Sequence, residues 1–146
     1  MKLQYFFTKV AYKYKRKVFH CDIQRSVIEN CKTVKGYFKH DSVVFCGSSD
    51  DFFKNVKLTP IALGFIDGDH NYEQVKNDFW NLFKHVVKGG FIFLHDTYPP
   101  SKAWTTENKC GTVYKLREDL EDYDGVECFT YTKSAFDVGL TMIRKL

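Results

Sequence analysis

The chain has 146 residues, 44% of them hydrophobic, and a formal net charge of +4 at pH 7. This length suits one domain with its own core, and so small a charge gives no reason to expect a nucleic-acid partner. No apolar run is long enough to span a membrane. The five cysteines form no CxxC pair, which favours free thiols in a reducing compartment. We therefore expect a single cytoplasmic domain over residues 1–146.

The first half of the chain is predicted to alternate strands with helices. Apolar runs bounded by polar residues indicate buried strands, and apolar residues at helical spacing indicate helices. The predicted elements are a strand over Val18–Cys21, a helix over Arg25–Thr33 that stops at Gly36, a strand over Val43–Cys46 and a short helix over Asp50–Val56. A glycine just past the last periodic residue is a usual helix stop.

The middle of the chain reads as a β-α-β unit. Two apolar runs, Ile61–Ile66 and Phe91–Leu94, flank a segment of helical periodicity, Tyr72–Val87, which is expected to end at Gly89-Gly90. Successive parallel strands place their carboxyl ends side by side, at the edge where ligands bind in open α/β sheets. The residues expected at this rim are Asp67, Asp69, His70, His95 and Asp96.

The same stretch carries a family resemblance. DGDHNYEQVKND from Asp67, followed by GGFIFLHDT ending at Thr97, resembles the signature DGDHxYxxVxxD…GGxxxxHDT of class I S-adenosylmethionine-dependent methyltransferases that act on small molecules or sugars. The resemblance implies a Rossmann-like α/β sheet, mostly parallel with an antiparallel C-terminal strand. It also implies three closing elements, namely a helix at about Val113–Leu120 and strands near Val126–Tyr131 and Phe136–Ile143.

The resemblance leaves a gap at the amino end. The family fold opens with a strand and a glycine-rich turn, whereas the first glycine of this chain is Gly36. Residues 3–15 resemble the helix that follows that turn, so we expect an N-terminally truncated domain whose first strand is missing. Three alternatives stay open: another chain completes the fold, which would make a homo-oligomer, the sheet closes up, or the domain is a remnant.

The cofactor implied by the resemblance is S-adenosylmethionine. Methyl transfer from a sulfonium requires the protein to align donor and acceptor and exclude water. Asp22, at the end of a strand, would accept from both ribose hydroxyls, although it could instead cap the following helix. The resemblance also implies that Ile23 packs against the adenine ring. It further implies that Ser49 and Asp50, in the turn that begins at Gly47, lie at the adenine edge. Ser49 and Asp50 could equally cap a helix, and Asp67 is expected beside the cofactor.

The rim residues also suggest a metal or a general base. In related metal-dependent oxygen methyltransferases, residues corresponding to Asp67 and Asp96 bind Mg²⁺, which lowers the pKa of the acceptor hydroxyl. Thr97 stands where a third side-chain ligand would be. Three possibilities therefore stay open: a Mg²⁺ site, a transition-metal site, and a rim held by hydrogen bonds without a metal. His70 and His95 are candidate general bases, and Asp96 completes the expected catalytic set.

Two functional hypotheses follow. The first is methyl transfer from S-adenosylmethionine to an oxygen of a small molecule or sugar, without a membrane or nucleic-acid partner. The second is a methyltransferase-like domain that binds or scaffolds without turnover. The first hypothesis is favoured by the acids and histidines at the expected site, namely Asp22, Asp67, His70, His95 and Asp96. The absent glycine-rich turn favours the second.

Overall fold

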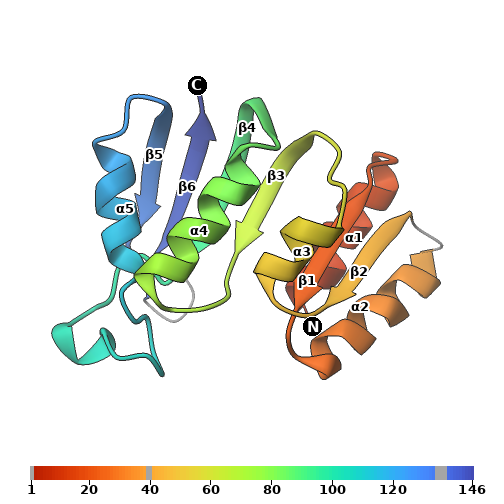
Figure 1. Ribbon diagram of the computed structural model, residues 1–146, viewed down its shortest axis with the longest axis horizontal. Coiled ribbons are helices and arrows are strands. Elements are labelled where there is room, and N and C mark those ends of the chain that lie inside the picture. Colours follow the sequence, from red (N-terminus) through yellow and green to blue (C-terminus); the bar gives the residue numbers. More distant parts are fainter. Residues whose placement is uncertain (1, 39–40, 134–137) are drawn as a thin grey trace. The chain divides into compact units, whose positions relative to one another are not determined.

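The computed structural model describes residues 2–38, 41–133 and 138–146. The chain forms two compact units, residues 1–58 and residues 59–146. Hydrogen bonding between strands gives two separate sheets, one of two strands and one of four (Figure 1).

The first unit is a two-stranded parallel sheet with helices. Its elements are α1 (Lys2–Lys13), β1 (Val18–Asp22), α2 (Arg25–Phe38), β2 (Ser42–Cys46) and α3 (Ser49–Asn55). Val18 pairs with Ser42 and Asp22 pairs with Cys46, so both strands end at the same edge. Within the described residues no strand precedes β1. The predicted strands and helices of this segment are confirmed.

Two details of the first unit differ from the prediction. Helix α2 does not stop at Gly36 but continues to Phe38. Gly36 lacks the left-handed backbone that makes glycine a helix stop, and a Cβ added there would meet nothing within 4 Å. Strand β1 is half-buried with Cys21 exposed, because β2 is its one strand neighbour in the described residues.

The second unit is a mixed four-stranded sheet with order β3-β4-β6-β5. Its elements are β3 (Ile61–Ile66), α4 (Tyr72–Phe83), β4 (Val86–His95), the 3-10 turn η1 (Lys102–Trp104), α5 (Val113–Glu121), β5 (Val126–Tyr131) and β6 (Leu140–Lys145). Strand β3 is parallel to β4, and β6 is antiparallel to β4 and β5. The predicted pattern of parallel strands with an antiparallel C-terminal strand is confirmed.

Helices α4 and α5 lie over one face of this sheet (Figure 1) and close its core. Phe79 of α4 has no exposed surface, and Leu116 and Leu120 of α5 are 1% exposed. They pack with Ile92 and Ile143 from the sheet. Burial of each such side chain contributes roughly 1.5–3 kcal/mol, so packing of α4 and α5 fixes the ends of the strands beneath them.

The boundary between α4 and β4 was wrongly predicted. The helix ends at Phe83 and the strand already begins at Val86, so Gly89 and Gly90 lie inside β4 and do not end a helix. A Cβ on Gly90 would lie 2.9 Å from the carbonyl oxygen of Val87 in β4 and 3.0 Å from that of Ala62 in β3, so the close approach of these backbone atoms requires glycine there.

The C-terminal strand begins later than predicted, at Leu140. Of its predicted residues, 136 and 137 lie outside the described part of the chain. In that described part no helix has the length and apolar content needed to cross a membrane.

Candidate functional site

The second unit builds its rim from the loops that follow β3 and β4. Asp69 Oδ1 accepts a hydrogen bond from the backbone N–H of Asn71 at 2.8 Å. Asn71 then caps α4, its Oδ1 accepting from the N–H of Glu73 at 2.9 Å. Asp69 therefore shapes the loop, and the neighbouring His70 is the side chain that joins the rim cluster.

Residues just before α5 hold the backbone of His70. The N–H of Thr112 donates to the carbonyl oxygen of His70 at 2.8 Å, and the Thr112 hydroxyl accepts from the N–H of Tyr72 at 2.8 Å. Gly111 has φ 54°, and a Cβ there would collide with the same carbonyl oxygen of His70. Only glycine allows this close approach with a left-handed backbone.

Asp96 is the centre of the rim cluster. Its side chain is 10% exposed, and Oδ2 lies 3.0 Å from Nδ1 of His95 and 3.2 Å from Nε2 of His70. Asp67 Oδ1 lies 3.5 Å from the same Nδ1 of His95. The buried thiol of Cys110 is a further hydrogen-bond partner of Asp96. The structure thus brings together four of the predicted site residues.

The cluster changes the acidity of its members. Burial raises the pKa of Asp96, but the hydrogen bond with His95 and the charges of His95 and His70 outweigh it, so that pKa lies below its ordinary value. The hydrogen bond with Asp96 raises the pKa of His95, with added contributions from the charges of Asp67 and Asp96. Burial, followed by the charge of Asp96, raises the pKa of the Cys110 thiol to about 11.

The two histidines differ in the partners of their ring nitrogens. His70 faces oxygens on both sides, with Nε2 toward Asp96 and Nδ1 3.3 Å from the carbonyl oxygen of Glu107. His95 meets carboxylates through Nδ1, and within the described residues its Nε2 makes no hydrogen bond. An imidazole held by Nδ1–H presents its lone pair on Nε2. Only His95 is therefore arranged to accept a proton from a third group.

The first unit places its candidate residues at the carboxyl ends of β1 and β2. Asp22 Oδ1 accepts from the N–H of Gln24 at 2.7 Å, and the N–H of Gly47 donates to the carbonyl oxygen of Asp22 at 3.0 Å. The second carboxylate oxygen of Asp22 has no hydrogen-bond partner among the described residues. Ile23 is 74% exposed. This edge thus presents a carboxylate oxygen beside an exposed apolar side chain.

The turn after β2 resolves the question of helix capping. Ser48 caps α3, with its hydroxyl accepting from the N–H of Asp51 at 3.1 Å and donating to the Asp51 carboxylate at 2.9 Å. The N-cap is therefore Ser48, and neither Ser49 nor Asp50 caps the helix as the alternative had supposed. Ser49 and Asp50 instead occupy the first turn of α3.

The sequence matches a protein family described as a methyltransferase domain over residues 4–97. The chain belongs to this family. The match covers residues 4–58 of the first unit and residues 59–97 of the second, which include the DGDHNY segment and the HDT segment. The methyltransferase domain has the α/β Rossmann-like fold of class I S-adenosylmethionine-dependent methyltransferases.

Solved structures support the fold at low sequence identity. The O-methyltransferase from Bacillus cereus in complex with SAH has a TM-score of 0.71 at 12% identity, covering 99% of this chain and 81% of that one. TomG, an O-methyltransferase of Streptomyces achromogenes involved in tomaymycin synthesis and solved with SAM, has a TM-score of 0.69 at 12% identity, covering 99% and 79%. A putative caffeoyl-CoA O-methyltransferase from Staphylococcus aureus gives 0.69 at 12%, covering 99% and 83%.

One curated protein resembles part of the methyltransferase domain more closely in sequence. It is an uncharacterized protein of Acanthamoeba polyphaga mimivirus, 53% identical over 36 residues. Those residues make up 25% of this chain and 16% of that protein. The chain therefore matches only a small fraction of the length of this curated relative.

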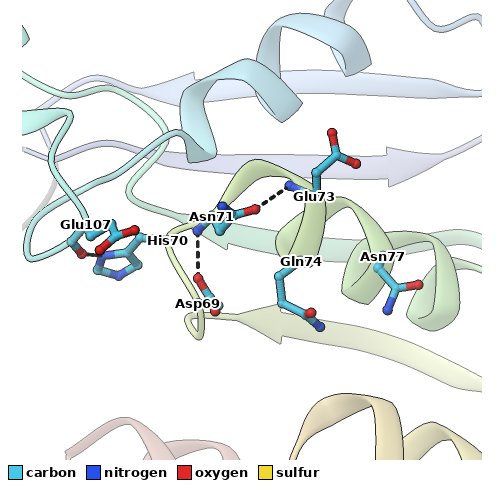
Figure 2. A pocket seen from close by; sticks show the side chains of 7 residues that line it. All are labelled: Asp69, His70, Asn71, Glu73, Gln74, Asn77 and Glu107. Atoms are coloured by element: carbon cyan, nitrogen blue, oxygen red, sulfur yellow. Dashed lines mark hydrogen bonds between the residues drawn. The ribbon is translucent and has the colours of Figure 1, made fainter.

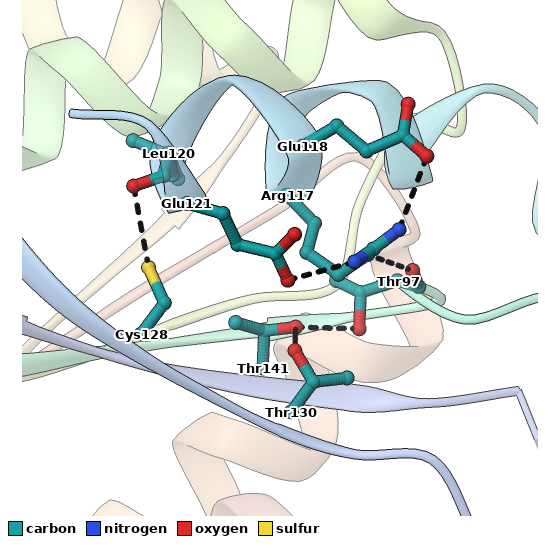
Figure 3. A network of polar contacts seen from close by, with 8 residues as sticks. All are labelled: Thr97, Arg117, Glu118, Leu120, Glu121, Cys128, Thr130 and Thr141. Atoms are coloured by element: carbon teal, nitrogen blue, oxygen red, sulfur yellow. Dashed lines mark hydrogen bonds and ion pairs between the residues drawn. The ribbon is translucent and has the colours of Figure 1, made fainter.

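The rim of the methyltransferase domain offers three metal donors. One ligand atom each from Asp67, His95 and Asp96 lie within 4.8 Å of one another. Thr97 does not add a fourth, because its side chain is buried and its hydroxyl accepts from Thr141 at 2.8 Å (Figure 3). One imidazole with two carboxylates fits a transition metal better than Mg²⁺, which prefers oxygen ligands.

A polar hollow of about 580 Å³ opens beside His70, along the start of α4 (Figure 2). Its lining consists of carboxylates, amides and one imidazole: Asp69, His70, Asn71, Glu73, Gln74, Asn77 and Glu107. Among the described residues, no hydrocarbon side chain, lysine or arginine lines it. His70 belongs to both the lining of the hollow and the rim cluster.

Sequence reasoning missed four residues of this region, namely Glu107, Cys110, Thr112 and Arg117. Glu107 acts through a backbone carbonyl and Thr112 mainly through its backbone N–H, which no side-chain pattern reveals. Cys110 gave no spacing signal, and Arg117 was counted as part of a helix. The pair Gly111-Thr112, a glycine before a helix start, was the one local signal available.

Proposed function

We propose that this chain transfers a methyl group from S-adenosylmethionine to an oxygen of a small polar molecule, with His95 as the general base. The observation that carries the proposal is the pairing of His95 Nδ1 with the buried Asp96 at 3.0 Å, which leaves Nε2 available to the acceptor. Carboxylate-oriented imidazoles of this kind serve as proton acceptors in many enzymes.

The proton transfer follows from this geometry. Asp96 holds Nδ1–H of His95, so the lone pair on Nε2 can take the acceptor's hydroxyl proton. S-adenosylmethionine supplies a methyl group that passes from sulfur to the acceptor oxygen as the carbon–sulfur bond breaks. Asp96 and Asp67 stabilise the imidazolium formed on His95. His70, held through both ring nitrogens, fixes Asp96 and borders the acceptor.

The cofactor would be held by the edge of the first unit. The unpartnered oxygen of Asp22 suits a ribose hydroxyl, and Ile23 suits the adenine ring, while Gly47, Ser49 and Asp50 would border the adenine edge. An acid at a strand end is the usual ribose partner in nucleotide-binding α/β sheets.

A metal role is the second part of the proposal. Asp67, His95 and Asp96 would hold a divalent ion, which would lower the pKa of the acceptor hydroxyl. The ion and the base role compete, because Nδ1 of His95 cannot donate to Asp96 and bind an ion together. Turnover measured in EDTA, then with Mg²⁺ or Mn²⁺ restored, separates the two: full activity in EDTA supports the base alone.

The hollow beside His70 favours a hydroxylated acceptor such as a sugar. Carboxylates and amides accept and donate hydrogen bonds to hydroxyl groups, and the three carboxylates of Asp69, Glu73 and Glu107 would repel an anionic acceptor. A lining without apolar side chains offers little to an aromatic acceptor.

Calorimetric titration of S-adenosylhomocysteine tests the cofactor edge. We expect saturable binding that Asp22→Asn weakens at least about tenfold, because a ribose hydrogen bond to a charged group contributes about 1.5–3 kcal/mol. Asp41→Asn is the matched control, since Asp41 lies just before the amino end of β2 and its side chain pairs with Lys17 at 3.7 Å. Equal losses in both variants would contradict the proposal.

Turnover with His95→Gln tests the base. We expect unchanged S-adenosylhomocysteine affinity and a loss of about 10²–10⁴-fold in methyl transfer, whereas His70→Gln should retain more activity. Binding of the cofactor by a wild-type chain that transfers no methyl group to polyol or sugar acceptors would instead favour the non-catalytic binding module.

A further inference from the structure

Thr97, the residue that follows Asp96, is held from two sides in the interior of the second unit. Its side chain is fully buried, and its hydroxyl accepts a hydrogen bond from the hydroxyl of Thr141 on β6 at 2.8 Å. Its carbonyl oxygen accepts from Nε of Arg117 on α5 at 3.1 Å. The sheet and a helix packed on it therefore both fix this single residue (Figure 3).

The threonine hydroxyls form an ordered chain. The Thr141 hydroxyl lies 2.9 Å from that of Thr130 on β5. Each hydroxyl has one proton, and Thr141 gives its own to Thr97, so Thr130 must donate to Thr141. The chain thus runs from the edge strand β5 through β6 to the end of β4, where the rim cluster begins.

Arg117 is itself immobilised. Its side chain is 15% exposed, and its two terminal nitrogens donate to Glu121 at 2.7 Å and to Glu118 at 3.1 Å. All three guanidinium nitrogens are therefore occupied, with Nε aimed at Thr97. A lysine has one nitrogen and could not reproduce this arrangement.

Asp96 needs such support because its backbone is unusual. It has φ 59°, a left-handed conformation that residues other than glycine adopt infrequently, asparagine and aspartate most often among them. Surrounding contacts must hold such a residue in place. The carboxylate of Asp96 reaches both histidines from that conformation, so a relaxation of the backbone would move it away from them.

We propose that Thr141 and Arg117 are positioning residues for methyl transfer: by holding Thr97, they keep Asp96 in the backbone conformation that orients His95. This inference rests on the proposed role of His95 as the base. Neither residue touches the reacting groups, and both act through Thr97. The hydroxyl chain and the guanidinium are independent supports, so each can be tested by itself.

The test compares Thr141→Val, Thr141→Ser and Thr130→Val in two measurements. Thr141→Val keeps the shape of the side chain and removes the hydroxyl, whereas Thr141→Ser keeps the hydroxyl. Thr130→Val removes the next hydroxyl in the row of threonine hydroxyls, on β5. Hydrogen–deuterium exchange of a peptide covering residues 95–99 reports on the turn without any need for activity. Steady-state kinetics report kcat and KM for the acceptor.

In Thr141→Val we expect faster exchange in residues 95–99 and a fall in kcat of about 10–100-fold with little change in KM, because a small misplacement of a catalytic group has effects of this size. Thr141→Ser should restore both, and Thr130→Val should leave both near wild type. Arg117→Lys should also speed exchange in residues 95–99, which covers the case in which Thr141→Val does not fold.

Unchanged exchange in residues 95–99 of a folded Thr141→Val or Arg117→Lys variant would overturn the proposal. A loss of kcat that Thr141→Ser fails to restore, or that Thr130→Val shares in full, would overturn it equally. If wild type proves inactive while Thr141→Val speeds exchange, the hold on Asp96 stands and only the proposed function fails.

Discussion

Replacing Asp96 by asparagine tests the centre of the rim cluster. Asparagine keeps the size of the side chain and tolerates the left-handed backbone of this position, φ 59°. It removes the negative charge that pairs with His95 Nδ1 in a hydrogen bond at 3.0 Å and lies 3.2 Å from His70 Nε2. Any effect therefore belongs to the charge and its hydrogen bonds, with the fold of the turn retained.

The expected loss of stability can be worked out from these contacts. Hydrogen bonds to charged groups contribute about 1.5–3 kcal/mol, and the low end applies because the His70 and His95 side chains are 28% and 24% exposed. The hydrogen bond with His95 gives about 1.5 kcal/mol and the ion pair with His70 about 1 kcal/mol, of which an asparagine oxygen would restore about 0.5 kcal/mol. Asp96→Asn should therefore cost about 2 kcal/mol. Asp96→Ala should cost about 3.5 kcal/mol, because alanine restores neither contact and also disfavours the left-handed backbone by about 1 kcal/mol.

Urea denaturation followed by tryptophan fluorescence suits this measurement. Trp80 and Trp104 are the two tryptophans of the chain, and both belong to the unit that holds Asp96. The signal therefore reports on the unfolding of that unit. A variant Asp96→Asn within about 0.5 kcal/mol of wild type, which is the usual range for a surface substitution, would refute the reasoning.

The pH dependence supplies a second check. The raised pKa of His95 stabilises the folded state below the ordinary histidine value of 6.5, and this contribution is lost as pH rises through the folded pKa. The lowered pKa of Asp96 stabilises it above the ordinary value of 3.8, and this is lost as pH falls through the folded pKa. The stability difference between wild type and Asp96→Asn should thus be largest between pH 3.8 and 6.5. A pH-independent difference would contradict the ion pair.

Three further substitutions test other parts of the structure. Gly111→Ala should lower the unfolding free energy by at least about 1–2 kcal/mol and slow methyl transfer, because the new Cβ meets the carbonyl oxygen of His70; wild-type stability and kinetics would contradict this. Phe79→Ala, at a fully buried site, should cost about 3–5 kcal/mol by the same tryptophan assay. Gly36→Ala should stabilise α2 by about 0.5–1 kcal/mol, seen by circular dichroism in thermal unfolding; a loss of stability would mean that α2 ends before Gly36.

Strand positions were predictable where they depend on local composition. Ile61–Ile66 was placed to the residue, since an apolar run bounded by polar residues leaves little choice, whereas the strand near Val126–Tyr131 followed from the family resemblance. The helix ends were not predictable in this way, because the effect of a glycine depends on its backbone conformation and on the atoms around it. Gly36 continues a helix, and Gly90 lies in a strand where Ala62 approaches closely. The sequence shows that a glycine is present but does not show which of these constraints it meets.

The candidate site was also predictable only in part. Two histidines at adjacent strand ends follow from the motif, so His70 and His95 were both named as possible bases. Their difference depends on the backbone carbonyl of Glu107, which occupies Nδ1 of His70 at 3.3 Å from within an irregular loop. No side-chain pattern encodes the position of that carbonyl. The assignment of His95 as the base therefore required tertiary structure, and exchanging the two histidines for glutamine one at a time is the measurement on which it depends.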